Sequence, residues 1–279
     1  MDLPFNVDLS GQVAVVTGGS GVIGGMFAKA LGACGAKVCV LGRKAENGAP
    51  VVDEIKKAGG EATAFAANVT DKESLLEAKK QILDTYGKIN ILLNVAGGAI
   101  KSAMVPQDQL ADQLPGEDTL FTMDPDNIKK EIDLNLYGTV LPTIIFGEAM
   151  LGQENANIVN IASMSSYRPL TRILGYSAAK AAVMNFTEWA AVYLAKSNVR
   201  VNAIAPGFFQ TTQNRALQFN EDGTPTHRTE KILRSTPQGK FGDPEDLVGG
   251  LLYLVSPASR FVTGVTLPID GGFSSYTGV

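Results

Sequence analysis

The stretch VAVVTGGSGVIG, residues 13–24, decides the fold class of this chain. A β-branched run is followed at once by a glycine-rich turn and then by residues with helical spacing. Glycines at such a junction let the backbone approach a pyrophosphate closely, and the N-terminus of the following helix attracts the anion. A tight strand-to-helix turn without a ligand would show the same glycines. The position of this turn at the first strand-to-helix junction favours a dinucleotide site.

Beyond this turn, short β-branched runs alternate with longer segments of helical period, which is the pattern of βαβ units. The expected strands cover residues 13–17, 37–41, 63–67, 89–94, 158–163, 199–205 and 265–269. The expected helices cover residues 23–34, 51–58, 72–86, 126–150, 176–196 and 245–255. Several strands are apolar almost throughout, as in sheets that helices cover on both faces. We therefore predict an α/β fold with a Rossmann-type doubly wound parallel sheet of about seven strands.

The length of 279 residues suits a single dinucleotide-binding and catalytic domain over residues 1–279. Two polar stretches, residues 98–123 and 208–240, interrupt the alternation of strands and helices. Both follow expected strand ends, where open α/β sheets bind their ligands. We predict that they are substrate-loop insertions.

Composition narrows the class of protein. The net charge of −4 gives no reason to expect a nucleic-acid partner. No basic segment with an apolar run opens the chain, and no apolar run has the length of a membrane span, so we expect no signal peptide and no membrane partner. Two cysteines, Cys34 and Cys39, form neither a disulfide framework nor a metal cluster. The chain is predicted to be cytoplasmic and to hold no metal.

The end of the second expected strand bears on the choice of nicotinamide cofactor. A dehydrogenase that selects NAD usually places an acidic residue there, on the ribose 2′-hydroxyl. This chain has Gly42, followed by Arg43 and Lys44. Arginine favours a 2′-phosphate through charge-assisted hydrogen bonds, so NADP(H) is favoured. A solvated basic turn is the alternative, and NAD(H) stays possible if Glu46 reaches the ribose.

The chemistry is predicted from the segment between Ser163 and Lys180. Tyr176 and Lys180 are four residues apart and share one face of a helix. Tyrosine has an ordinary pKa of about 10, and a neighbouring ammonium lowers it. Ser163, thirteen residues before Tyr176, ends a strand and can hydrogen-bond a substrate carbonyl. A pair on the surface of a helix is the plain alternative, but the small residues around this pair favour close packing.

Together these motifs resemble the short-chain dehydrogenase/reductase family over essentially the whole chain. They are residues 17–24, Asn94-Val95-Ala96-Gly97, Asn135, Ser163, Tyr176, Lys180, Pro206-Gly207 and Asp270-Gly271-Gly272. The resemblance implies catalysis by Asn135, Ser163, Tyr176 and Lys180. Tyr176 would exchange the proton, Lys180 would also hold the nicotinamide ribose, and Asn135 would bind the water that links Lys180 to solvent.

The resemblance also implies the residues that bind the cofactor. Residues 94–97 would line the adenosine end and steady the sheet, Pro206-Gly207 would border the carboxamide, and Thr211 would bond the carboxamide or the phosphates. The chain departs from the family at Val22, where a glycine is usual, so we expect a slightly different turn. It departs again at Asn68, where the family often has an aspartate beside the adenine. The full expected set is Thr17, Gly18, Gly19, Ser20, Gly21, Val22, Ile23, Gly24, Arg43, Lys44, Asn68, Val69, Asn94, Ala96, Gly97, Tyr176, Lys180, Pro206, Gly207, Phe209 and Thr211.

The substrate is indicated by polar residues near Ser163 and Tyr176. Arg168 and Arg172 would form a clamp for a carboxylate, since guanidinium groups match carboxylates. The other expected substrate contacts are Ser165, Gln213 and Arg215. Ion pairs at the surface or between subunits are the alternative for the arginines, and the sole histidine of the chain is expected to be solvated.

Within the family the chain resembles the sugar-acid branch, most of all the D-mannonate oxidoreductases (fructuronate reductases). The resemblance lies in residues 167–172, residues 205–209 and the ending from Asp270 to Gly278. It implies interconversion of a keto-uronate and an aldonate by a homotetramer. Reduction of 4-deoxy-L-erythro-5-hexoseulose uronate or of 5-ketogluconate stays open, as does a 3-oxoacyl or general ketone reductase. An alternative of another class is a non-catalytic nucleotide-binding regulator, which would have no need of all four catalytic residues.

Overall fold

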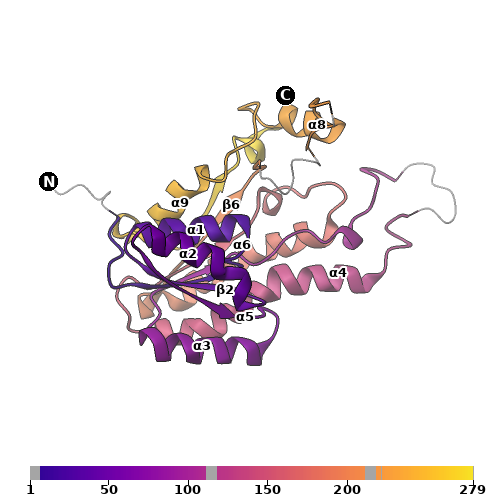
Figure 1. Ribbon diagram of the computed structural model, residues 1–279. Helices are drawn as coiled ribbons and strands as arrows, with labels where there is room; N and C mark the ends of the chain where they lie inside the picture. Colours follow the sequence, from indigo (N-terminus) through magenta and orange to yellow (C-terminus); the bar gives the residue numbers. More distant parts are fainter. Residues whose placement is uncertain (1–6, 111–117, 211–217, 221, 279) are drawn as a thin grey trace.

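A seven-stranded sheet forms the centre of the molecule, with every neighbouring pair of strands parallel. The computed structural model describes residues 7–110, 118–210, 218–220 and 222–278. In chain order the strands are β1 (Val13–Thr17), β2 (Lys37–Gly42), β3 (Glu61–Ala66), β4 (Ile91–Asn94), β5 (Asn157–Ile161), β6 (Arg200–Pro206) and β7 (Thr266–Ile269). Their order across the sheet is β3-β2-β1-β4-β5-β6-β7. The predicted doubly wound parallel sheet is confirmed (Figure 1).

Alternate residues of the central strands enter two separate hydrophobic cores. On β1, Ala14 and Val16 belong to one core, while Val13 and Val15 belong to the other. Successive side chains of a strand point to opposite faces of the sheet, and both faces here are covered, so the strand must be apolar throughout. This is the physical reason for the uninterrupted apolar runs of the sequence.

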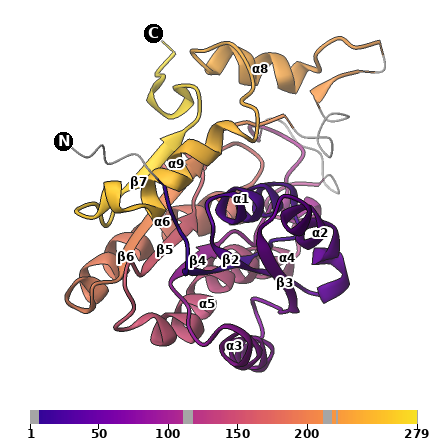
Figure 2. The same cartoon turned by 60° about the vertical axis from the view of Figure 1, so that its left-hand side comes forward.

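The helices form one layer on each face. The first layer consists of α1 (Val22–Ala33), α2 (Ala49–Lys57) and α9 (Asp246–Val255), whose apolar residues share one core. The second consists of α3 (Lys72–Tyr86), α5 (Gly138–Gly147) and α6 (Leu174–Leu194), whose apolar residues share the other. Figures 1 and 2 show α1 and α3 on opposite sides of the sheet.

The helix expected over residues 126–150 is present but not uniform. It runs as α4 (Pro125–Ile132), a π-helical turn η3 (Asp133–Tyr137), α5 and a 3-10 turn η4 (Glu148–Met150). The π-helical turn contains Asn135. Such turns are wider than an α-helical turn and are frequent at functional sites. The hydrophobic pattern predicts a helix over the whole segment and does not distinguish one π-helical turn within it.

The second polar insertion also contains a helix that the sequence did not predict. Within residues 208–240, α8 (His227–Ser235) begins after Thr226, whose side chain accepts a hydrogen bond from the Thr229 N–H. Only Thr229 and Ile232 of α8 are buried, so the apolar signal was too weak to indicate a helix. Figure 2 shows α8 standing apart from the helices that cover the sheet. None of the helices in the described ranges is long and apolar enough to cross a bilayer.

Candidate active site

The glycine-rich turn lies between β1 and α1 in a conformation that only small residues allow. Gly18 has a φ of +62°, in the left-handed region. A Cβ added to Gly24 would lie 2.2 Å from the carbonyl oxygen of Gly18, so the first turn of α1 packs directly on the loop. Gly21 is the extended N-cap of α1, and no side chain caps this helix end. The backbone is therefore open to an anion at the helix N-terminus.

Val22 fits this turn without distortion. It is the first residue of α1 and lies in the helical region, so no positive φ is required of it. The left-handed residue of the turn is Gly18, so Val22 is free of the strain of a positive φ, and the slightly different turn stays a prediction. The described loop, from Thr17 to Gly24, brings small residues and an uncapped helix N-terminus together.

The end of β4 is tied to the glycine-rich turn by Thr17. The Thr17 hydroxyl donates to the carbonyl of Leu93 at 3.2 Å and accepts from the N–H groups of Val95 and Ala96 at 3.0 and 3.2 Å. Thr17 is completely buried. Its side chain thus sets the relative position of two segments that were expected to bind the cofactor.

Asn94 acts within the sheet. Its Nδ2 donates to Asn160 Oδ1 at 2.9 Å and to Thr143 Oγ1 at 3.0 Å, and the side chain is buried. These contacts support the expectation that Asn94 stabilises the sheet. They direct the Asn94 amide into the protein rather than toward an adenosine.

The end of β2 brings a serine and an arginine to one place. A Cβ added to Gly42 would lie 3.1 Å from Ser20 Oγ, so Ser20 of the glycine-rich turn lies against the strand end that precedes Arg43. Arg43 is exposed, and Lys44 lies 3.9 Å from Glu46. No acidic residue occupies the strand end, and the only acid nearby in the chain, Glu46, pairs with Lys44.

The pair Asn68-Val69 has a local structural role. Asn68 Oδ1 accepts from the N–H of Thr70 at 3.2 Å and from its hydroxyl at 3.0 Å. Val69 is buried, and a Cβ added to Gly138 would lie 2.9 Å from its Cγ2. Asn68 is exposed, so its Nδ2 can still face an adenine.

Tyr176, Lys180 and Ser163 come together as the sequence predicted. Tyr176 and Lys180 lie on α6, and Lys180 Nζ is 5.7 Å from the centre of the Tyr176 ring. Ser163 follows β5 and hydrogen-bonds the Tyr176 side chain. Lys180 Nζ donates to the carbonyl of Ile161 at 2.7 Å. Lys180 and Ser163 are almost completely buried, so this is not a pair on the surface of a helix.

Burial decides the charge state of these groups. It raises the pKa of Tyr176, the hydrogen bond with Ser163 lowers it in part, and the Glu131 carboxylate raises it further. The net pKa of Tyr176 is above its ordinary value in the free chain, so burial outweighs the expected stabilisation of the phenolate by Lys180. Burial also lowers the pKa of Lys180 to about 8, which leaves the ammonium largely protonated near neutrality.

Asn135 holds the loop after β4. Its Nδ2 donates to the carbonyls of Gly98 and Glu131, each at 2.9 Å, and its Oδ1 accepts from the Gly98 N–H at 2.9 Å. A Cβ added to Gly97 would lie 2.7 Å from Asn135 Oδ1 and 3.3 Å from Lys180 Nζ, so only glycine fits there. The side-chain amide of Asn135 is fully engaged by the backbone. A water-binding role for Asn135 stays a prediction. The backbone carbonyl of Asn135 would have to bind the water, because the side chain is engaged.

The segment after β6 is shaped by close packing. A Cβ added to Gly207 would lie 2.6 Å from the Cα of Asp270, which places Pro206-Gly207 directly against residues 270–272. Phe209 is buried in the core beside α9, and a Cβ added to Gly242 would lie 2.5 Å from its ring. Phe209 therefore fixes the segment by packing. Thr211, expected at the cofactor, and Gln213 and Arg215, expected at the substrate, lie outside the described residues.

The two arginines expected to clamp a substrate already have protein partners. Arg172 Nε lies 2.7 Å from Asp108 Oδ1, and Arg168 Nη1 donates to the carbonyl of Tyr276 at 3.2 Å. These contacts hold loops together, as in the surface ion pairs that were the alternative, and a clamp for a substrate carboxylate stays a prediction. Ser165 differs, because its hydroxyl is buried and has no hydrogen-bond partner among the described residues. Ser165 lies two residues after Ser163 and stays a candidate substrate contact.

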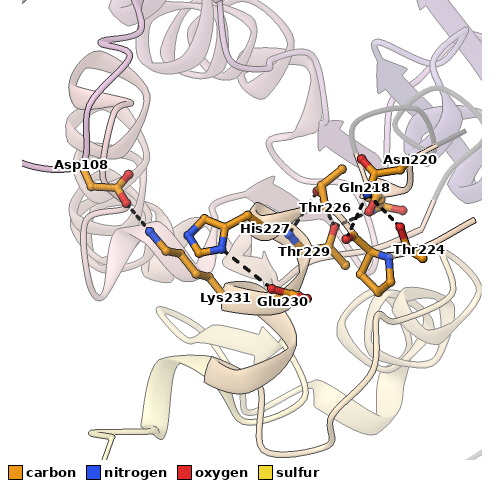
Figure 3. A network of polar contacts seen from close by, with 10 residues as sticks. Asp108, Gln218, Asn220, Thr224, Thr226, His227, Thr229, Glu230 and Lys231 are labelled. Atoms are coloured by element: carbon orange, nitrogen blue, oxygen red, sulfur yellow. Dashed lines mark hydrogen bonds and ion pairs between the residues drawn. The ribbon is translucent and has the colours of Figure 1, made fainter. Parts of the chain in front are cut away.

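Asp108 joins three segments above the carboxyl end of the sheet, and sequence reasoning missed it. Besides Arg172, it accepts from Lys231 of α8 at 2.7 Å and from the Thr171 hydroxyl at 3.1 Å. These partners hold the pKa of Asp108 well below its ordinary value. Figure 3 shows Asp108 and Lys231 pointing toward one another, with His227 and Glu230 beside them on α8. His227 is exposed, as expected.

Metal ligation has no visible basis in the part of the chain described: no three His, Cys, Asp or Glu side chains there are placed to share an ion. Both described cysteines are free thiols. The arrangement fits proton transfer beside a dinucleotide.

Comparison with known proteins agrees with this geometry. The family described as short chain dehydrogenase matches residues 12–222. The oxidoreductase UxuB of Bacillus subtilis (strain 168), itself uncharacterized, is 45% identical over 99% of this chain and 100% of its own length.

Two solved structures extend the comparison. One is a proposed D-mannonate oxidoreductase from Haemophilus influenzae with bound NAD, 43% identical with a TM-score of 0.95 over 98% of this chain and 99% of that one. The other is a gluconate 5-dehydrogenase from Burkholderia cenocepacia J2315 with NADP and tartrate, 28% identical with a TM-score of 0.84 over 98% of each chain.

Proposed function

The chain belongs to the short-chain dehydrogenase/reductase family and is an oxidoreductase that uses a nicotinamide cofactor, and from that premise we propose that its substrate is a sugar acid of the D-fructuronate/D-mannonate type. The reaction interconverts a keto-uronate and an aldonate. The arrangement of Ser163, Tyr176 and Lys180 carries the reaction type. The similarity to a proposed D-mannonate oxidoreductase over nearly the whole chain supports the substrate class.

The cofactor would be held by the glycine-rich turn and the end of β4. The close approach of Gly24 to Gly18 leaves a backbone cradle for the pyrophosphate, and Lys180 and Tyr176 would face the ribose of the nicotinamide. The nicotinamide, when bound, supplies or accepts the hydride.

The proton is handled by the residues of this chain. In the reduction, Ser163 donates a hydrogen bond to the substrate carbonyl, and Tyr176 gives its hydroxyl proton to that oxygen as negative charge develops. The buried Lys180 ammonium stabilises the phenolate that results. In the oxidation the same phenolate takes the proton of the alcohol.

Within the sugar acids, the relatives leave more than one substrate open. Tartrate, a hydroxylated dicarboxylate, is bound with the gluconate 5-dehydrogenase of similar structure. The unpartnered hydroxyl of Ser165 suits a polyhydroxylated substrate better than an acyl chain or a simple ketone, because it offers a buried hydrogen bond. Reduction of 5-ketogluconate or of a deoxy-hexoseulose uronate is the second candidate.

A substrate screen tests the proposal directly. Oxidation of reduced nicotinamide is followed by absorbance with fructuronate, tagaturonate, 5-ketogluconate, deoxy-hexoseulose uronate and a neutral ketone. We expect a keto-acid to exceed the neutral ketone in kcat/KM by at least about 100-fold, since a ketone without hydroxyl and carboxylate groups leaves polar groups of the site, such as the Ser165 hydroxyl, without a partner. Turnover of the neutral ketone alone would leave the oxidoreductase intact and reject the sugar acid.

We further propose that NADP(H) is preferred over NAD(H), although the similar Haemophilus protein holds NAD. The support is the end of β2, where Ser20 lies against Gly42, the exposed Arg43 follows, and no carboxylate occupies the strand end. We expect Arg43→Ala to lower kcat/KM with NADPH by about 10- to 100-fold, because a charge-assisted contact is worth about 1.5–3 kcal/mol. The value with NADH should change little.

A control separates this effect from a general loss of positive charge. Lys56→Ala removes an exposed cation from the last turn of α2 and should leave both cofactors unaffected. Equal or better turnover of the unmodified protein with NADH would reject the NADP(H) preference.

We also propose a homotetramer. Large apolar side chains on the outer face of α6 support it, since Trp189 and Tyr193 are 59% and 70% exposed and stack at 5.0 Å. Exposed aromatic clusters of this kind mark interfaces between proteins.

A further inference from the structure

Glu131 is a buried carboxylate whose position needs a physical reason. It lies in the last turn of α4 with no part of its surface exposed. Among the described residues it takes part in no ion pair. Burying an unpaired carboxylate is costly unless hydrogen bonds or dipoles hold it.

The two carboxylate oxygens of Glu131 face two different segments of the active site. Oε1 accepts a hydrogen bond from the Ile100 N–H at 2.7 Å, in the segment that follows β4. Oε2 is buried and makes no hydrogen bond of good geometry within the described ranges, although the N–H of Tyr176 is near enough to the carboxylate to influence its pKa. It faces the first turn of α6, because a Cβ added to Gly175 would lie 2.7 Å from it.

The first turn of α6 attracts this carboxylate. Gly175 has no side chain to fill the space. Burial raises the pKa of Glu131, and the N–H groups of Ile100 and Tyr176 offset that rise only in part. Negative charge at a helix N-terminus is stabilising. The backbone carbonyl of Glu131 meanwhile accepts from Asn135 Nδ2 at 2.9 Å. One residue thus contacts the segment after β4, the π-helical turn and the helix of Tyr176.

We propose that Glu131 is a positioning residue for Tyr176, whose buried carboxylate joins the first turn of α6 to the segment after β4. The inference rests on the proposed role of Tyr176 as proton donor. Glu131 does not touch the reacting atoms and acts through the residue that does.

The negative charge of Glu131 has a second effect on the reaction. The titratable groups on the packed face of α6 are Tyr176 and Lys180, and Glu131 raises the pKa of Tyr176. The other charged groups nearby, Lys101 and the pair Lys129–Asp133, are directed to solvent. A higher pKa keeps Tyr176 protonated over a wider pH range. Glu131 therefore favours the acid form that carbonyl reduction needs.

Glu131→Gln tests the charge without removing the acceptor for Ile100. Titration of Tyr176 is followed by the ultraviolet absorbance of its phenolate, as the difference between each protein and its Tyr176→Phe counterpart. We expect the pKa of Tyr176 to fall by about 0.5 to 1 pH unit in Glu131→Gln, since removal of a nearby negative charge favours the phenolate. The rising limb of kcat/KM for alcohol oxidation should move to lower pH by the same amount.

Asp133→Asn is the matched control. It neutralises a carboxylate two residues away, which is 43% exposed and pairs with Lys129 at 2.6 Å. This variant should leave both the titration and the pH profile unchanged. If Glu131→Gln does not fold, Glu131→Asp takes its place: it keeps the charge on a shorter side chain. In Glu131→Asp the pKa of Tyr176 should stay at its native value, while amide hydrogen exchange at Ile100 and Tyr176 becomes at least about 10-fold faster.

The inference is overturned if Glu131→Gln folds and titrates like the unmodified protein, or if Asp133→Asn shifts the titration equally. In Glu131→Asp, unchanged exchange at Ile100 and Tyr176 would overturn it as well. The titration needs no substrate. If the pKa of Tyr176 shifts in Glu131→Gln but the unmodified protein turns over no keto-acid, the sugar-acid proposal is rejected and the role of Glu131 is kept. If a keto-acid is turned over but the pKa of Tyr176 does not shift, the role of Glu131 is rejected and the sugar-acid proposal is kept.

Discussion

Tyr176→Phe lowers kcat by about 1000-fold or more with the best substrate, because removal of a general acid costs about 100- to 10,000-fold. The hydroxyl is hydrogen-bonded to Ser163, and the ring of Tyr176 lies 5.7 Å from the buried Lys180 ammonium, which places this hydroxyl to donate the proton. The dissociation constant of the reduced cofactor should stay within about threefold, since the glycine-rich turn is unchanged. Steady-state kinetics and cofactor fluorescence measure the two quantities.

Tyr167→Phe provides the same chemical change away from the reaction. The Tyr167 hydroxyl donates to the carbonyl of Thr266 at 2.7 Å, and the side chain is 40% exposed. Loss of that hydrogen bond should lower the free energy of unfolding by about 1 kcal/mol and leave kcat nearly unchanged. A Tyr176→Phe variant that retains a tenth of the native kcat would contradict the assigned role and favour the reading of the chain as a nucleotide-binding regulator.

Gly24→Ala should raise the dissociation constant of the cofactor by at least about 100-fold. The new Cβ would lie 2.2 Å from the Gly18 carbonyl oxygen and 2.8 Å from its carbon, and both are backbone atoms with little freedom to move. The glycine-rich turn must therefore separate from α1, which removes the cradle for the pyrophosphate. We also expect the free energy of unfolding to fall by about 1–3 kcal/mol, as in other overpacked sites.

Gly249→Ala is the control for this substitution. Gly249 lies on the exposed side of α9, and nothing lies within 4 Å of an added Cβ. Alanine in the interior of a helix should raise the free energy of unfolding by about 0.5–1 kcal/mol and leave cofactor binding intact. Native affinity for the cofactor in Gly24→Ala would show that the pyrophosphate binds elsewhere.

Much of the fold could be predicted because its signals are local. The alternation of short β-branched runs with helical segments specifies parallel strands joined by helices, and each signal spans only a few residues. The signals that begin helices are equally local: the Asp71 side chain caps α3, and Pro125 is the first residue of α4. The helix α8 was missed because only two of its residues are buried.

By itself the sequence determined the parallel α/β fold, the glycine-rich turn and the grouping of Ser163, Tyr176 and Lys180. In each case residues close along the chain contain the pattern. Only the tertiary structure decided which polar groups are buried and what they bind. Glu131 meets Ile100 across 31 positions and Asp108 meets Lys231 across 123, and in the sequence both acids look like ordinary surface residues. The same limit applies to Arg172: its ion pair with Asp108 could not be predicted, since an ion pair depends on distance in space and not along the chain.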